Sequence, residues 1–110
     1  MRRVATHRIG DVITGEWLPV SVIELDEGGY VSRIYPLQGE ISHTEWLPGM
    51  ILLSPFPVER TPDEPFADFM RRLKRQAASC NGHSLCRAYW LTSFSLSAMD
   101  FTPRSRVVLL

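Results

Sequence analysis

The sequence predicts an α+β fold: a mainly antiparallel, small β-sandwich-like protein with one main α-helix inserted between two β regions. An acidic-glycine turn at 26–29 separates two segments rich in β-branched and aliphatic residues, as in a hairpin. Residues 61–78 then show a helix start and an apolar stripe at helical spacing. Residues 87–98 alternate with a period of two, which is typical of a strand. At 110 residues, the whole chain 1–110 is expected to form a single domain.

The N-terminal half is predicted to be built from short strands. Residues 4–9 form the first, and residues 10–19, which contain two glycines and a proline, form a loop. Residues 20–25 and 30–35 are the two arms of the hairpin, because Asp26 can bond its own backbone and the following glycines tolerate a positive φ. This hairpin is the clearest local prediction in the half.

A second group of short segments follows the hairpin. Residues 36–42 are a polar loop, and residues 43–47 are a short extended piece that ends at Pro48-Gly49. Residues 50–53 (Met-Ile-Leu-Leu) are apolar at every position, which predicts a strand buried on both faces. Pro55 and Pro57 prevent this strand from continuing.

The helix is predicted over residues 66–78. Thr61 is a candidate cap, Pro62 suits the first helical position and Glu64 completes a capping box, while Asp63 is the alternative cap because Pro65 follows so closely. Acidic residues lie near the start and basic residues near the end, an order that suits the helix dipole. The apolar stripe consists of Phe66, Phe69, Met70, Leu73 and Ala77.

The C-terminal part is predicted to be two strands. Residues 87–98 place Trp90, Thr92 and Phe94 on one face and Leu91 with three serines on the other, so one face is expected to be buried and the other wet. Thr102-Pro103 marks a turn, and residues 106–110 form a terminal strand. This last strand is either an edge open to pairing or a covered central strand.

Composition excludes several classes of partner. The 12 basic and 12 acidic residues give a formal net charge of zero, which argues against nucleic acid and membrane surfaces and leaves self-association unopposed. No apolar run approaches the length of a membrane span, and the basic N-terminus lacks the apolar region of a secretory signal. The two cysteines are too few for a disulfide scaffold, so we expect a cytoplasmic protein with reduced thiols.

The run 80–86 contains the residues with the most metal-like spacing. Cys80, His83 and Cys86 are close enough in sequence to converge on zinc, but structural zinc sites use four protein ligands and no second cluster lies nearby. A Cys80–His83 nucleophile pair would need an orienting third group. Two reduced cysteines and a surface histidine in a helix-to-strand loop are therefore the preferred interpretation. Tightly held zinc that is lost in Cys80→Ser would favour the metal alternative.

Three further groups have a chemical and a structural interpretation. Glu40, His43 and Glu45 could serve acid–base chemistry, yet a solvated edge or loop explains them better. The basic run 71–75 could contact phosphates, but a solvated helix face fits the neutral chain. Burial in the core or in an interface is expected for the tryptophans, which are Trp17, Trp46 and Trp90.

Several marks in residues 2–53 occur together in one known family. They are Val22-Ile23-Glu24-Leu25, the tetrad Asp26-Glu27-Gly28-Gly29, Tyr30-Val31-Ser32-Arg33-Ile34, Thr44-Glu45-Trp46 and Pro48-Gly49. This half resembles the N-terminal β-sandwich segment of bacterial amidohydrolases of the deaminase type. The family continues into a His-x-His metal pair at the start of a (β/α)₈ barrel, whereas this chain continues Met50-Ile51-Leu52-Leu53. The resemblance thus implies a fold for this half without the family's metal-dependent activity.

The sequence therefore favours a non-catalytic module that binds a protein partner or associates with itself. No catalytic, cofactor-binding or metal-binding residue is assigned, and no cofactor is expected. The alternative is a small metal-binding protein or enzyme that uses the Cys80/His83/Cys86 loop. A nucleic-acid binder that uses the basic helix ranks third.

Overall fold

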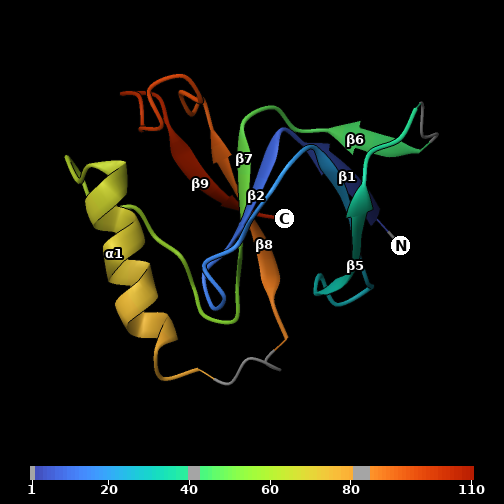
Figure 1. Ribbon diagram of the computed structural model, residues 1–110, viewed down its shortest axis with the longest axis horizontal. Coiled ribbons are helices and arrows are strands. Elements are labelled where there is room, and N and C mark those ends of the chain that lie inside the picture. The colour runs from blue at the N-terminus through green and yellow to red at the C-terminus, as the bar shows by residue number, and fades with distance from the viewer. Residues whose placement is uncertain (1, 40–42, 81–84) are drawn as a thin grey trace.

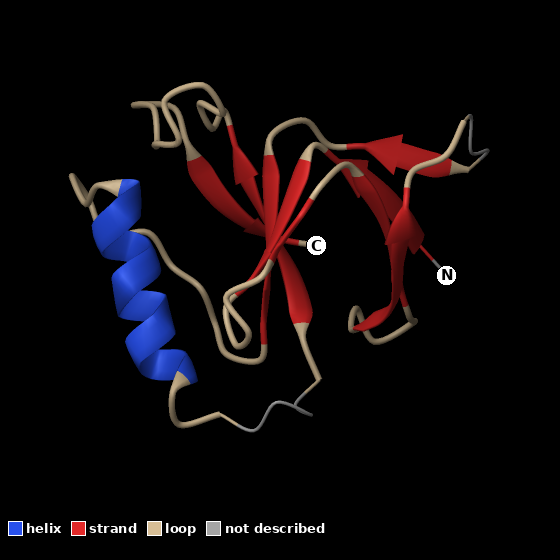
Figure 2. Cartoon of the chain, in the orientation of Figure 1, coloured by secondary structure: helices blue, strands red, loops and turns tan. Residues whose placement is uncertain are grey.

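Nine strands and one helix form three layers in the described residues of the computed structural model, which are 2–39, 43–80 and 85–110. The helix covers one face of a five-stranded sheet, and a four-stranded sheet lies on the other side (Figures 1 and 2). The predicted α+β class with one inserted helix is confirmed.

The elements divide between the two sheets in a fixed order. The four-stranded sheet consists, from edge to edge, of β5 (Val31–Pro36), β4 (Ser21–Leu25), β1 (Arg2–Thr6) and β6 (Thr44–Trp46). The five-stranded sheet consists of β3 (Trp17–Leu18), β2 (Arg8–Asp11), β7 (Met50–Ser54), β8 (Arg87–Thr92) and β9 (Arg106–Leu109). The helix is α1 (Phe66–Ala77), and it ends one residue before the predicted limit. Pairing is antiparallel except between β1 and β6 and between β2 and β7.

The predicted single strand over 4–9 is wrong, because the chain changes sheets at His7. Val4 and Ile9 are both fully buried in the cluster between the two sheets. Their odd separation would put them on opposite faces of one straight strand. A bend at His7, with β1 before it and β2 after it, lets both side chains enter the same core. The predicted loop over 10–19 is also interrupted, because Trp17–Leu18 pairs with β2 as β3.

The hairpin forms as predicted between β4 and β5. One carboxylate oxygen of Asp26, Oδ1, accepts hydrogen bonds from the N–H groups of Gly28 and Tyr30, both at 2.9 Å. Gly29 adopts a φ of +85°, which residues with a Cβ rarely adopt. Asp26 and Gly29 therefore close the turn in the way that the sequence predicts.

Strand β7 is buried on both faces, as predicted from its uniform apolar sequence. Met50 and Leu52 belong to the cluster under the helix, and Ile51 and Leu53 belong to the cluster between the sheets. All five residues of the strand are buried. Strand β7 is therefore the common wall of both cores.

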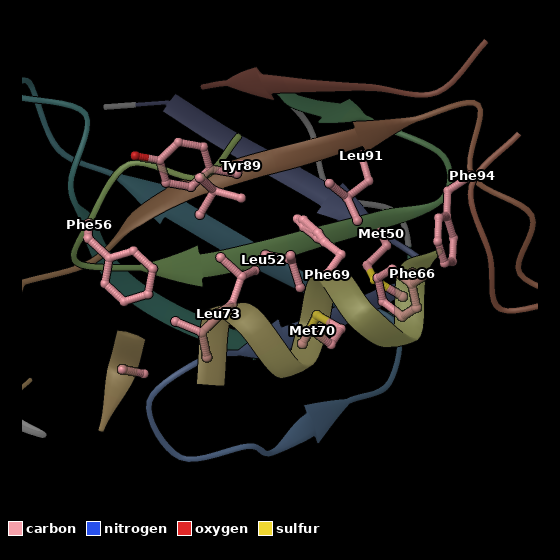
Figure 3. Packing of buried hydrophobic residues seen from close by; sticks show 13 residues of the cluster. Met50, Leu52, Phe56, Phe66, Phe69, Met70, Leu73, Tyr89, Leu91 and Phe94 are labelled. Atoms are coloured by element: carbon pink, nitrogen blue, oxygen red, sulfur yellow. The ribbon is translucent and has the colours of Figure 1, made fainter. Parts of the chain in front are cut away.

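The helix packs its predicted stripe onto the five-stranded sheet. Phe69 and Leu73 are fully buried, and Figure 3 shows them facing Met50 and Leu52 of the sheet. The opposite face of α1 carries exposed charged residues. The amphipathic pattern therefore predicted both the helix and the side that it buries.

The predicted cap at the start of the helix is wrong. Asp63 has a positive φ of 61°, and Pro65 is the capping residue without a side-chain hydrogen bond, so Thr61 and Glu64 do not form a capping box. Pro65 disfavours a helical backbone conformation at Glu64, the residue before it, so the helix begins only at Phe66. Asp100 supplies the cap instead, because its carboxylate accepts the Phe66 N–H at 3.0 Å.

This distant cap makes stability depend on pH. Hydrogen bonds from the backbone N–H groups of Phe66 and Phe101 lower the pKa of Asp100 below its ordinary value of 3.8. A lowered folded pKa contributes stability above the unfolded value, and that contribution is lost as the pH falls through the folded pKa. We expect Asp100→Asn, which keeps an accepting oxygen but removes the charge, to lower the free energy of unfolding near pH 7.

The difference in free energy of unfolding between wild type and Asp100→Asn should shrink as the pH falls below 3.8 and through the lowered folded pKa. Urea denaturation at several pH values measures it. Glu64→Gln is the comparison variant. The pKa of Glu64 is also lowered, but mainly because its carboxylate accepts a hydrogen bond from the Arg72 side chain, so it does not report on the helix cap. A pH-independent difference for Asp100→Asn would show that its carboxylate does not act through its charge.

The predicted strand over 87–98 is half as long, because β8 ends at Thr92. Ser93 has a φ of +51°, and its carbonyl accepts hydrogen bonds from the hydroxyls of Thr102 and Ser105. Hydroxyl side chains compete in this way with strand pairing, so the serine-rich alternation does not extend the ladder. The expected wet face is wrong as well, since Tyr89 and Leu91 pack under the helix while Ala88 packs between the sheets.

Candidate interaction surface

The predicted terminal strand forms, and it lies at an edge of the five-stranded sheet. Leu110, just after β9, donates its N–H to the Ala88 carbonyl at 3.0 Å, so the even-numbered residues of this segment face β8. The backbone N–H and C=O groups of Val107 and Leu109 consequently point away from β8. They make no hydrogen bond to another residue in the part of the chain that the structure describes. These four groups form an open pairing edge.

An apolar groove runs beside this edge on the helix side of the sheet. Its volume is about 440 Å³. One wall is formed by Val107 and Leu109, whose side chains share a face with Tyr89 of the neighbouring strand. The opposite wall is the segment after β7, which contributes Pro55, Phe56, Pro57, Val58 and Glu59. The two prolines that end β7 thus also build the wall of a groove.

The groove ends at Tyr30 and Arg87, next to the hairpin turn. The Arg87 guanidinium lies 4.8 Å from the centre of the Tyr30 ring and donates to the Gly28 carbonyl. Burial raises the pKa of the Tyr89 hydroxyl above its ordinary value of 10.0, so this phenol is neutral near pH 7. The end of the groove is therefore aromatic and positively charged, and its walls are apolar apart from Glu59.

A second depression, of about 400 Å³, lies where the chain crosses between the sheets. His7 Nδ1 accepts the Gly49 N–H at 3.0 Å, and the Trp46 ring meets the imidazole edge-on with centroids 4.7 Å apart. Trp90 donates its indole N–H to the Pro48 carbonyl at 2.9 Å. The interactions of His7 and Trp90 brace the crossing, so we assign this depression a structural role.

The structure describes only part of the predicted Cys80/His83/Cys86 group, because His83 lies outside the described residues. Cys80 and Cys86 are half-buried and not joined by a disulfide. Burial, with a smaller contribution from Asp11, raises the pKa of the Cys86 thiol above 9.0. A raised pKa disfavours the thiolate, the form that binds metals and attacks substrates. Within the described ranges, no group of three metal-ligating side chains converges.

The remaining candidates from the sequence are separated in space or paired. Glu40 is outside the described residues, and Glu45 forms an ion pair with Arg2 at 2.8 Å, so it does not join His43 in an acid–base group. In the basic run, Arg72 pairs with Glu64 at 2.9 Å, and Arg71 pairs with Asp68.

The tryptophans differ from the expectation of burial. The exposed fractions of Trp17 and Trp46 are 41% and 47%, and only Trp90 is partly buried. Trp17 lies across Gly10, where an added Cβ would meet its ring at 2.8 Å. Because Gly10 has no side chain, the Trp17 ring can pack against β2, and the ring still stays exposed.

No helix among the described residues is long and apolar enough to cross a membrane. Comparison with known proteins finds no matching family model, no matching curated protein and no matching solved structure. The resemblance of residues 2–53 to an amidohydrolase segment therefore stays a prediction.

Proposed function

We propose that this protein is a non-catalytic interaction module that binds an extended segment of another chain by adding it as a strand to β9. The observation that carries the proposal is the open edge at Val107 and Leu109, next to an apolar groove. In strand addition, backbone hydrogen bonds provide affinity and pockets for alternate side chains provide specificity. The edge would supply the hydrogen bonds, and the groove would receive every second side chain.

The other sheet edges support this assignment, because each is short or protected. Strands β3 and β6 have two and three residues, too few to pair with a long segment. Strand β5 carries Arg33 and Pro36, and the pairing of β4 with it shifts register at Leu25. Charges, prolines and irregular register are the usual protections of an edge. Residues 107–109 of β9 (Val-Val-Leu) have none of them.

Side-chain exposure supports the same edge. Val108 and Leu109 are 38% and 49% exposed, although both are apolar. Val108 points to the face opposite the groove, so an added strand would cover apolar side chains on both faces. Burial of apolar area is the main favourable term in such an association.

The proposal is tested with Leu109→Pro. Proline removes the outward N–H donor of the edge and leaves the bonds of Val108 and Leu110 to β8 intact. Leu109→Ala is the matched control, because it shortens the same side chain but keeps the N–H. We expect the proline variant to bind a partner at least about tenfold more weakly than the alanine variant, since a net hydrogen bond contributes about 1 kcal/mol and edge geometry is also lost.

The measurement begins with affinity capture on tagged wild type and both variants, followed by quantitative mass spectrometry. The segment of each captured partner that crosslinks to β9 is then titrated as a peptide. A partner whose affinity for Leu109→Pro equals that for wild type would place the interface elsewhere. Circular dichroism and thermal melting of each variant establish that it is folded before binding is compared.

A further inference from the structure

We propose that the strand added to β9 is β9 of a second copy of this chain, in antiparallel orientation about a twofold axis at Val108. This inference rests on the proposed function and names its partner. In this register, Val107 of each copy faces Leu109 of the other. The outward N–H and C=O groups of the two residues then bond reciprocally, as in the hydrogen-bonded pairs of an antiparallel ladder. An interface of this kind uses the same surface on both copies.

The register is also supported by charge. It places Arg106 of one copy opposite Leu110 of the other, on the same face of the joined sheet. Leu110 lines a depression together with Asp26 and Glu27 of the hairpin turn and with Arg2, whose charge is already paired with Glu45. Arg106 of each copy therefore lies near Asp26 and Glu27 of the other copy. The twofold symmetry makes this contact occur twice in the dimer.

The charged groups involved are available for this contact. Arg106 and Glu27 are exposed, and neither forms an ion pair with another described residue. A parallel, in-register pairing would instead put the two Arg106 side chains next to each other. The chain as a whole has a formal net charge of zero, so two copies do not repel each other over distance. Charge thus favours the antiparallel arrangement.

The groove supports the same arrangement. Because the twofold axis is perpendicular to the joined sheet, the grooves of both copies lie on one face. Val107 of one copy then lies beside the exposed Leu109 of the other, and the two apolar walls become continuous. Val108 meets its own counterpart on the opposite face. Each of the apolar side chains at 107–109 therefore lies against an apolar side chain of the other copy.

The test uses charge reversal and sedimentation equilibrium over a range of protein concentration. Arg106→Glu and Glu27→Arg each create two like-charge contacts in the dimer, so each variant alone should dissociate about tenfold more readily than wild type. An equimolar mixture of the two variants has two opposite-charge contacts in the heterodimer. The mixture should therefore associate with an affinity close to that of wild type, and this rescue should weaken as salt is added.

Each outcome decides between the possibilities. Heterodimer rescue, together with a monomeric Leu109→Pro variant, supports the pairing. A dimer that Leu109→Pro does not weaken, or a mixture without rescue, overturns it. A wild type that stays monomeric at about 1 mM also overturns it, and the proposed function still holds if a partner segment binds wild type but not Leu109→Pro. If neither association depends on Leu109, the proposed function fails as well.

Discussion

Phe69→Ala is expected to lower the free energy of unfolding by about 3–5 kcal/mol, the range for removing a large buried aromatic side chain. Phe69 is fully buried at the centre of the helix–sheet core. Its ring centre lies 5.1 Å from that of Phe101 and 6.1 Å from that of Phe66. These neighbours are fixed by the helix and by the loop that supplies its cap, so they cannot move in to fill the space.

Urea denaturation with linear extrapolation measures the effect. Lys74→Ala is the control, because Lys74 lies on the exposed face of the same helix and its loss should change stability by at most about 0.5 kcal/mol. The loss for Phe69→Ala is a large fraction of the usual stability of about 5–15 kcal/mol. A loss below about 1 kcal/mol would mean that Phe69 does not anchor α1 to the sheet.

The sequence predicted the elements whose signals are local. The hairpin depends on Asp26 and Gly29, which are next to the turn that they form, and the helix depends on a stripe contained within its own residues. Strand β7 was recognisable as doubly buried because all of its side chains are apolar. In each case the residues that determine the structure are neighbours in the chain.

Three of the errors have the opposite character, because each involves a contact with a residue at least 9 positions away in sequence. The helix cap comes from Asp100, 34 positions after the N–H that it accepts. Strand β8 stops where Ser93 accepts hydrogen bonds from Thr102 and Ser105. At the bend between β1 and β2, His7 accepts a hydrogen bond from the N–H of Gly49, 42 positions away. Local periodicity contains no information about such contacts.

The candidate surface was predictable only in part. The apolar run 107–110 indicated a strand with a tendency to pair, but its position at an edge follows from the strand order, which the sequence does not state. In the sequence, Pro55 and Pro57 indicate only the end of a strand, because their part in the groove wall depends on tertiary packing. Tyr30, just before β5, meets Arg87 of β8, although the two residues are far apart in sequence. A surface built from separate elements is therefore visible only in the fold.

Gly49→Ala is expected to be the second large perturbation, with a loss of about 2–3 kcal/mol. Gly49 lies where β6 leads into β7, and its φ is +106°, a conformation that residues with a side chain adopt only under strain. A Cβ there would also lie 3.2 Å from the Leu91 carbonyl oxygen, a backbone atom held in β8. Any shift that relieves this contact would disturb the hydrogen bond from Gly49 to His7, which joins the two crossings between the sheets.

Gly15→Ala is the matched control for Gly49→Ala, because Gly15 has a φ of +76° but no atom within 4 Å of an added Cβ. Its substitution tests the backbone cost alone, which we expect to be about 1 kcal/mol. Parallel urea melts at pH 7 separate the two contributions. Equal losses for the two variants would mean that the Leu91 contact and the His7 bond add nothing to backbone strain. A larger loss for Gly49→Ala, together with His7→Ala lowering stability by a similar extra amount, would show that this crossing couples the two sheets.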